Sequence, residues 1–153
     1  MTGMQTEPYQ EWARQVLGYE FTRIELLVTA LTHRSYVNEH RKSVSEHNER
    51  LEFLGDAVLE LVVTEYLFAK YDEPEGILTS WRAALVRTES IGEAGDKVGY
   101  APLVRMSRGE KNGGERARQQ ILANAFEAVI GAIYLERGYD LSLIHISEPT
   151  RPY

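Results

Sequence analysis

Residues 47–60, HNERLEFLGDAVLE, are the stretch on which the fold prediction rests. They open a longer segment, residues 48–70, in which apolar residues recur every three or four positions: Leu51, Leu54, Val58, Leu61 and Val62. This spacing places apolar side chains on one face of an α-helix, so it predicts a long, largely buried helix. Ser45 and Asn48 are both good N-cap residues, and either would set its start.

Helical periodicity also marks most of the remaining chain, whereas the signal for strands is weak. Further helices are expected over these ranges: residues 11–17, 23–31, 78–99 and 121–135. The third range could hold one helix or two, starting at Thr79 or Ser80, with its glycines as weak points. YDEPEG (71–76) is expected to form a turn and SRGEKNGGERAR (107–118) a loop. The predicted fold class is all-α, in one domain.

Composition bounds the class of protein. With 43% hydrophobic and 26% charged residues, the 153-residue chain is typical of a folded soluble domain. It has no cysteine, which excludes disulfides and thiolate metal sites. No apolar run approaches the roughly 20 residues of a membrane span, and residues 1–10 are too polar for a signal peptide. We therefore expect a cytoplasmic protein that has no membrane partner.

The net charge of −6 points away from nucleic-acid binding if it is taken alone, because phosphate contacts require Lys and Arg. An acidic balance also arises where carboxylates are gathered to hold metal ions. Net charge does not decide between these two interpretations.

The end of the chain is unusual. Residues 141–151, LSLIHISEPTR, neither continue the preceding helix nor resemble a linker. They match, in one reading frame, the translation of a transposase adapter used to prepare DNA sequencing libraries. We interpret residues 141–153 as a non-native tail that follows a domain of residues 1–140, and the alternative is a genuine C-terminal tail. Independent sequencing of the source locus distinguishes the two.

Glu49, Glu52 and Asp56 are three and four positions apart, so on a helix they share one face. Like charges at this spacing repel, and burial of carboxylates is costly unless they are paired or bind a metal. A purely structural helix gains nothing from the arrangement. The residues alone leave three interpretations: a solvated acidic face, ion pairs with Arg50 or Arg82, or a metal site.

A second polar pair, Asn124 and Glu127, lies one helical turn apart within ILANAFEAVIGAIYL (121–135). Glu127 is the only charged residue of that segment, so it needs either a basic partner or a cation. Two runs of oxygen ligands on two helices that could pack together would suit Mg²⁺.

These segments together resemble a known family. Residues 47–60 closely resemble the signature of the ribonuclease III family. Three other landmarks follow the family order: ALTHRSYVNE (30–39), EGILTSWRAALVRTESI (75–91) and GEKNGGERARQQILANAFEAVIGAIYLERG (109–138). The resemblance covers residues 10–140. It implies an all-α endonuclease domain that forms a homodimer, with an acidic centre from each subunit at the ends of a shared valley for double-stranded RNA.

The resemblance also implies roles for individual residues. Metal binding is implied for Glu52, Asp56, Asn124 and Glu127, and catalysis for the three acids among them. RNA contact is implied for Glu49, Lys111 and Asn112. Dimer contact is implied for Phe53, which would enter a socket on the partner subunit, and for Glu75. The implied reaction is hydrolysis of double-stranded RNA with two Mg²⁺ ions, for which Mn²⁺ would substitute. It would leave 5′-phosphate and 3′-hydroxyl ends during rRNA and mRNA processing.

The sequence departs from the family pattern at position 124, where the usual residue is Asp and this chain has Asn. The amide oxygen can still bind Mg²⁺, but one negative charge is lost, so we expect weaker metal binding. The double-stranded-RNA-binding domain that usually follows in the family is absent from these residues, which should lower RNA affinity. The alternative function is that of a non-catalytic RNA-binding or ribosome-associated relative, which keeps the fold but loses its acids.

Overall fold

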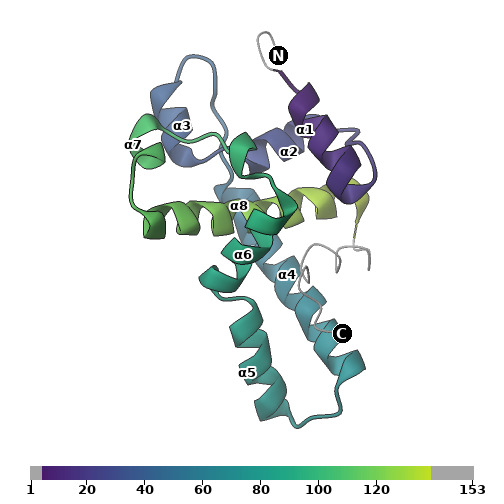
Figure 1. The fold of residues 1–153 in the computed structure, drawn as a ribbon. Coiled ribbons are helices and arrows are strands. Elements are labelled where there is room, and N and C mark those ends of the chain that lie inside the picture. The colour runs from purple at the N-terminus through teal and green to yellow at the C-terminus, as the bar shows by residue number, and fades with distance from the viewer. Residues whose placement is uncertain (1–4, 139–153) are drawn as a thin grey trace.

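The computed structural model describes residues 5–138, and the secondary structure of these residues is mainly helical (Figure 1). The α-helices are α1 (Glu7–Trp12), α2 (Ile24–Ala30), α3 (Arg34–Glu39), α4 (Glu49–Lys70), α5 (Glu75–Leu85), α6 (Thr88–Val98), α7 (Arg108–Lys111) and α8 (Glu115–Arg137). A π-helical turn (Ala13–Leu17) continues α1, and a 3₁₀ turn (Ala101–Leu103) follows α6. The β pairing found within residues 5–138 is an isolated parallel bridge between Thr32 and Arg105. The all-α prediction is confirmed.

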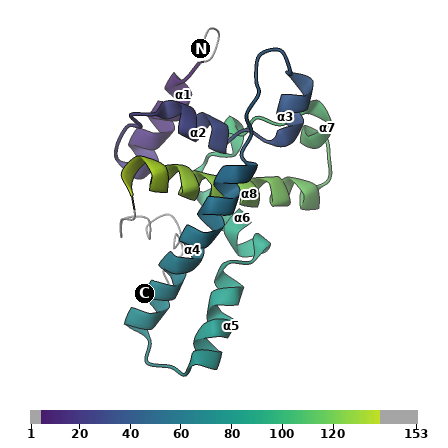
Figure 2. The same ribbon diagram turned by 180° about the vertical axis from the view of Figure 1, so that it is seen from behind.

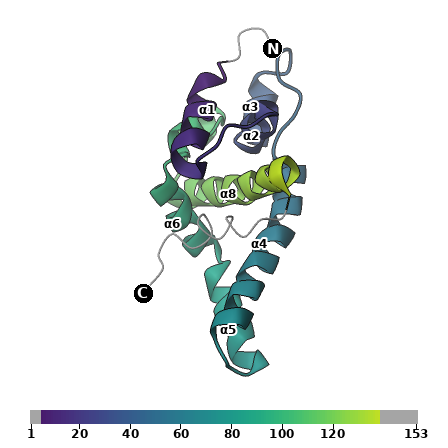
Figure 3. The same cartoon turned by 90° about the vertical axis from the view of Figure 1, so that its right-hand side faces the viewer.

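The centre of the fold is α8, which contacts α2, α4, α6 and α7. In the side view of Figure 3, α8 is seen between α4 on one side and α6 on the other. Every residue from 121 to 133 is buried except Asn124 and Glu127, which are half-buried. A helix that is apolar around its whole circumference must be surrounded by other elements, and this burial explains the position of α8.

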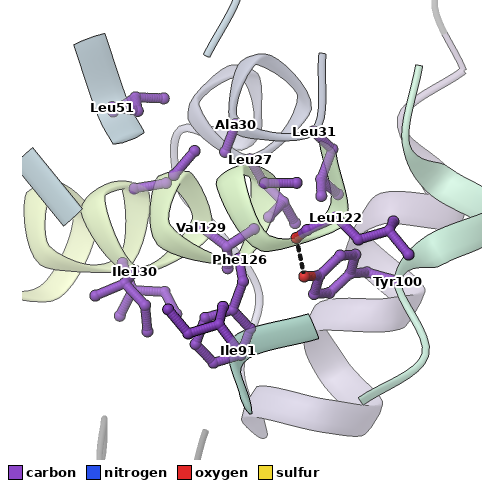
Figure 4. Packing of buried hydrophobic residues seen from close by; sticks show 14 of the residues in the cluster. Leu27, Ala30, Leu31, Leu51, Ile91, Tyr100, Leu122, Phe126, Val129 and Ile130 are labelled. Carbon is purple, nitrogen blue, oxygen red and sulfur yellow. Dashed lines mark hydrogen bonds between the residues drawn. The ribbon is translucent and has the colours of Figure 1, made fainter. Parts of the chain in front are cut away.

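Aromatic residues fill the core beside α8 without leaving polar groups unsatisfied (Figure 4). The hydroxyl of Tyr100, which is buried, donates a hydrogen bond to the carbonyl of Leu122 at 2.6 Å. Trp12 packs edge-on against Tyr100, with ring centroids 6.2 Å apart, and its Nε1 donates to the carbonyl of Val98 at 2.7 Å. These contacts join α1 and α6 to α8, because each ring buries its apolar body while its polar atom has a partner.

Helices α4 and α5 extend away from this core as a helical hairpin (Figures 1 and 2). Large apolar side chains are exposed along it: Phe53, Leu61, Phe68, Ile77, Trp81 and Leu85. Phe53 is 83% exposed and Phe68 79%. So many exposed apolar residues on two adjacent helices are typical of an interaction surface rather than of a solvated one.

The contact between α4 and α8 depends on two glycines. A Cβ atom on Gly55 would collide with the carbonyl oxygen of Glu127, and one on Gly131 would collide with that of Leu51. Because both obstacles are backbone atoms, side-chain rearrangement cannot make room for a methyl group. The two helices therefore touch backbone to backbone, one turn from Glu52 on α4.

Several predicted helices are confirmed. Residues 23–31 and 121–135 correspond to α2 and to the apolar part of α8, and residues 48–70 correspond to α4. Asn48 is the N-cap residue of α4, but its side chain makes no capping bond and instead donates to the carbonyl of Ala30 at 3.0 Å. Asn48 thereby ties the start of α4 to the end of α2.

The predicted start of the next helix was wrong. Helix α5 begins at Glu75 rather than at Thr79 or Ser80, so the turn expected over residues 71–76 is too long. Pro74 precedes the helix with φ −63° and ψ 158°, and its carbonyl accepts the first hydrogen bonds of α5. A proline in this position needs no N–H partner, so it starts the helix here rather than ending one.

The glycines expected to weaken the segment over residues 78–99 do not break it. The break falls at residues 86–87, and Gly92 and Gly95 lie buried inside α6. A Cβ atom on Gly95 would collide with the Tyr100 hydroxyl, and one on Gly92 would collide with the side chain of Gln119. Both glycines therefore serve close packing, which a one-dimensional pattern does not distinguish from helix breaking.

The loop expected over residues 107–118 is also partly helical. The Oγ of Ser107 accepts a hydrogen bond from the N–H of Glu110 at 3.1 Å and caps the four-residue helix α7. Helix α8 then starts directly after Gly114, six residues earlier than the apolar periodicity suggested. The boundary predicted at residue 140 and the tail predicted over residues 141–153 lie outside the described residues. None of the helices within the described range is long and apolar enough to cross a membrane.

We predict that Gly55→Ala destabilises the fold by about 3 kcal/mol, because the added methyl group forces α4 and α8 apart. Chemical denaturation monitored by circular dichroism measures this change. Gly76→Ala is the matched control, since a Cβ atom there meets nothing within 4 Å. The control should be neutral or slightly stabilising. Equal effects of the two substitutions would contradict the backbone contact as its cause.

Candidate active site

The acids that the sequence singled out meet where α4 crosses α8. Burial, a hydrogen bond with Asp56 and the negative charges of Asp56 and Glu52 together raise the pKa of Glu127 to about 8, and burial has the largest effect. Such coupling requires the three carboxyl groups to be close. The structure thus brings Glu52 and Asp56 of α4 together with Glu127 of α8.

The cluster carries uncompensated negative charge. Burial raises the pKa of Glu52, and the charges of Glu49 and Asp56 add to that effect. No ion pair joins Glu52, Asp56 or Glu127 to a basic residue in the described part of the chain. Glu52 and Glu127 are half-buried and Asp56 is exposed. Carboxylates this close together without a basic partner are unfavourable, and a bound cation would relieve their repulsion.

Ion pairing with Arg50 or Arg82, the alternative explanation of the acidic face, is not what the structure shows. Arg82 donates a hydrogen bond to the hydroxyl of Thr64 at 3.0 Å instead. Arg50 is exposed on α4 and forms no ion pair with a described residue. Glu52, Asp56 and Glu127 are therefore not neutralised by a basic residue among those that the structure describes.

Asn124 lies one turn before Glu127 on α8 and is half-buried. Its Oδ1 accepts a hydrogen bond from Nε2 of Gln120 at 2.9 Å, which holds the amide in one orientation. All four residues expected to bind metal are therefore carried by α4 and α8, the two helices in backbone contact.

The donor set is chemically suited to a hard divalent cation, since it consists of carboxylate and amide oxygens. Among residues 5–138, however, no three His, Asp or Glu side chains are gathered closely enough to enclose a metal ion by themselves. The charges of Asp56 and Glu52 add to burial in raising the pKa of Glu127, so the potential at this carboxyl group is negative, as a cation site requires.

Glu49 has a different environment from the other acids of α4. Its Oε2 lies 3.1 Å from Nη1 of Arg34, the first residue of α3. The sequence pattern did not indicate that Arg34 pairs with Glu49, because the two residues are 15 positions apart and no helical spacing connects them. Its place within the segment over residues 30–39 was the only signal available.

Lys111 and Asn112, predicted to contact RNA, lie at the C-terminal end of α7 and are exposed. Helix α7 contacts α8, and the backbone N–H of Arg108 at its start donates to Oε2 of Glu39 on α3 at 3.1 Å. The structure places the two residues on the α3–α7 side of the molecule, with their side chains accessible.

Comparison with known proteins assigns the family. A family model described as Ribonuclease-III-like matches residues 23–147. The chain belongs to the ribonuclease III family. It is 50% identical over 131 residues to a Listeria monocytogenes protein named Ribonuclease 3, covering 85% of this chain and 57% of that protein. It is 52% identical over 128 residues to Ribonuclease 3 of Bacillus cytotoxicus, covering 83% and 52%.

A solved structure of the nuclease domain of ribonuclease III from Campylobacter jejuni is also similar. It has a TM-score of 0.81 and 42% identity, covering 94% of this chain and 99% of that one. The present chain thus spans little more than half the length of the curated relatives it matches, and nearly the whole of a solved ribonuclease III nuclease domain.

Two residues expected at a dimer interface of this ribonuclease III domain lie on the α4–α5 hairpin. Phe53 projects from α4 with 83% of its surface exposed. Glu75 lines a groove of about 420 Å³ between α4 and α5, whose lining residues are Thr64, Leu67, Phe68, Glu73, Glu75, Leu78, Thr79 and Arg82. An exposed ring and an apolar groove with a charged rim are thus present on one hairpin.

Other conspicuous residues of the family segments have structural roles. His33 is the N-cap residue of α3 and accepts a hydrogen bond from the N–H of Ser35 at 3.1 Å. The hydroxyl of Ser35 accepts one from the N–H of Ser107 at 2.9 Å, joining α3 to the start of α7. Burial lowers the pKa of His33. These residues hold helix ends together, as their types and positions predict.

We predict that the metal-free domain loses stability as pH rises from about 5 to about 8. The pKa of Glu127 is about 8 in the folded chain and near 4.5 when unfolded, so over this interval the folded state holds a proton that the unfolded state has lost. Glu127→Gln should flatten the dependence. Chemical denaturation in EDTA at several pH values measures both proteins. The opposing contribution of His33 is common to both, so parallel curves would contradict the assignment to Glu127.

Proposed function

We propose that this chain is the nuclease domain of an endoribonuclease that hydrolyses phosphodiester bonds of double-stranded RNA with divalent metal ions. The observation that carries the proposal is the convergence of Glu52, Asp56 and Glu127, from two helices, into a cluster that raises the pKa of Glu127 to about 8. A stability-driven fold would not retain such a group, so its presence supports a functional site.

The relatives support the same proposal. The proteins named Ribonuclease 3 match over more than four fifths of this chain, and the family model matches residues 23–147, a range that contains all four candidate metal ligands. The Campylobacter jejuni structure that matches it is described as a nuclease domain. Retention of the three acids argues against the alternative, a non-catalytic RNA-binding or ribosome-associated relative.

In the proposed site, Glu52, Asp56, Glu127 and the amide oxygen of Asn124 hold Mg²⁺, or Mn²⁺ in its place. When bound, the cations supply a water of lowered pKa and stabilise charge on the departing oxygen. Glu127 must release its proton before it can act as a ligand, so metal binding is weaker at low pH. The products would be 5′-phosphate and 3′-hydroxyl ends, in rRNA or mRNA processing within the cytoplasm.

Double-stranded RNA would be recognised by its A-form shape, through phosphate and 2′-hydroxyl contacts rather than through base edges. Lys111 and Asn112 are accessible at the end of α7 for contacts of this kind, and Glu49 is accessible at the start of α4. The chain as a whole has a net charge of −6, so RNA affinity must come from locally basic surfaces and from bound cations.

We further propose a homodimer, so that two acidic clusters act on one RNA duplex. Phe53 would insert into the α4–α5 groove of a second copy, beside Phe68 and near Glu75. The exposure of Phe53 and the apolar floor of the groove support this arrangement. The solved Campylobacter jejuni nuclease domain is described as having a region involved in dimer formation.

The first test is cleavage of a long, fully paired RNA duplex in the presence of Mg²⁺. The parent chain should produce short fragments, and EDTA should abolish them. Glu127→Gln should reduce the rate on the order of a hundredfold or more, because it removes a metal ligand and its charge. Gel electrophoresis of end-labelled RNA measures both rates.

Glu25→Gln, the same chemical change at an exposed position of α2, should leave the rate unaltered. Asn124→Asp should lower the Mg²⁺ concentration needed for half-maximal cleavage, because it restores a negative charge. Absence of cleavage by a folded parent dimer that still binds the duplex would favour the non-catalytic alternative.

The dimer has its own prediction. Phe53→Ala should shift the chain from dimer to monomer in sedimentation velocity at micromolar concentration, because it removes the most exposed phenylalanine ring of α4. Leu135→Ala, which truncates a 43% exposed residue at the far end of α8, should leave the dimer intact. A parent chain that sediments only as a monomer would contradict the proposed assembly.

A further inference from the structure

Arg34 occupies a position that no role yet accounts for. Its Nη1 lies 3.1 Å from Oε2 of Glu49, and the two side chains are 62% and 51% exposed. Glu49 is one helical turn from Glu52, and its charge raises the pKa of Glu52. The guanidinium of Arg34 therefore stands at the edge of the acidic cluster.

The backbone that carries Arg34 is held firmly on both sides. His33 caps α3 immediately before it, and the hydroxyl of Ser35 immediately after it accepts a hydrogen bond from the N–H of Ser107. The carbonyl of Arg105 accepts from the N–H of His33 at 2.8 Å. Because the backbone of Arg34 is already ordered by these hydrogen bonds, less conformational entropy is lost when its side chain binds a ligand.

The pairing of Arg34 with Glu49 leaves much of the guanidinium available. A guanidinium has five N–H donors in a planar fork, and the contact with Glu49 uses Nη1. With 62% of its side-chain surface exposed, Arg34 is accessible to a further ligand. The fork matches phosphate oxygens in geometry and remains charged at any physiological pH.

The surroundings of Arg34 favour an anionic ligand. Exposed basic residues are present on α7 and in the segment after α3: Arg41, Lys42, Arg108 and Lys111. Helices α3 and α7 lie side by side, as Figures 1 and 2 show and as the bond from Arg108 to Glu39 requires. In a chain of net charge −6, these residues place cations on the side of the molecule where Arg34 contacts Glu49.

We propose that Arg34 binds a backbone phosphate of double-stranded RNA at the entrance to the acidic cluster, and that Glu49 orients its guanidinium. This inference rests on the proposed function, since it assumes the same substrate. In this arrangement Glu49 contributes to RNA binding through Arg34 rather than by contact with phosphate, which would repel its carboxylate. The role also explains why Glu49, unlike Glu52 and Asp56, has a basic partner.

The test measures binding of a fluorescently labelled, fully paired RNA duplex over a series of KCl concentrations. All proteins carry Glu127→Gln, so that the duplex stays uncut in Mg²⁺. Arg34→Gln should weaken binding about tenfold and lower the slope of log Kd against log salt by about one, as loss of one phosphate contact requires. Arg34→Lys should keep the slope but recover only part of the affinity, because it keeps charge without the fork.

Arg14→Gln is the matched control. Arg14 is likewise an ion-paired arginine, bonded to Glu7, Glu11 and Glu20 on the turn that continues α1, so its loss changes net charge equally. Its affinity and slope should equal those of the parent. Circular dichroism and thermal unfolding confirm that each variant is folded.

Two results would overturn the assignment to Arg34: an unchanged slope and affinity in Arg34→Gln, or the same losses in Arg14→Gln. Failure of the proposed function looks different, because the parent protein with Glu127→Gln would then not bind the duplex at all. That result would remove both proposals together.

Discussion

The backbone contact between α4 and α8 at Gly55 and Gly131 is the constraint on which the rest of the structure depends. Since neither position has a side chain, the helices approach until the carbonyl of one meets the Cα of the other. A larger separation would move the acids of α4 away from Glu127 and weaken their effect on its pKa. The same close approach places α8 in the core, where α2, α6 and α7 contact it.

The clustered carboxylates of the candidate site make the folded state of this core less stable. Glu127 is half-buried within an otherwise buried stretch of α8, beside carboxylates that no described cation neutralises. Apolar packing on the other faces of α8 offsets the free-energy cost of burying Glu127 there. Phe126, Val129 and Ile130 are each about 1% exposed on those faces (Figure 4). A surplus of apolar burial on one side of a helix thus permits an unfavourable charge on another.

Two surfaces flank the acidic cluster, and they differ in character. The α4–α5 hairpin is apolar and grooved, as an interface with another protein copy requires, whereas the α3–α7 side bears accessible cations. Phe53 and Glu52 are adjacent on α4, so the helix turns one face to the proposed partner subunit and another to the proposed substrate. In the proposed function, one helix therefore serves both the assembly and the chemistry.

The sequence by itself determined the helical class and the long helix over residues 48–70, because apolar periodicity acts within one helix. It also singled out Glu52, Asp56, Asn124 and Glu127 as candidate ligands, through their resemblance to the family's residues. Only the tertiary structure decided that Glu127 meets Asp56, that Arg34 pairs with Glu49, and that Gly92 and Gly95 pack rather than break α6. These facts depend on which surfaces of separate helices touch. Such contacts are set by packing between distant segments, and no local spacing encodes them.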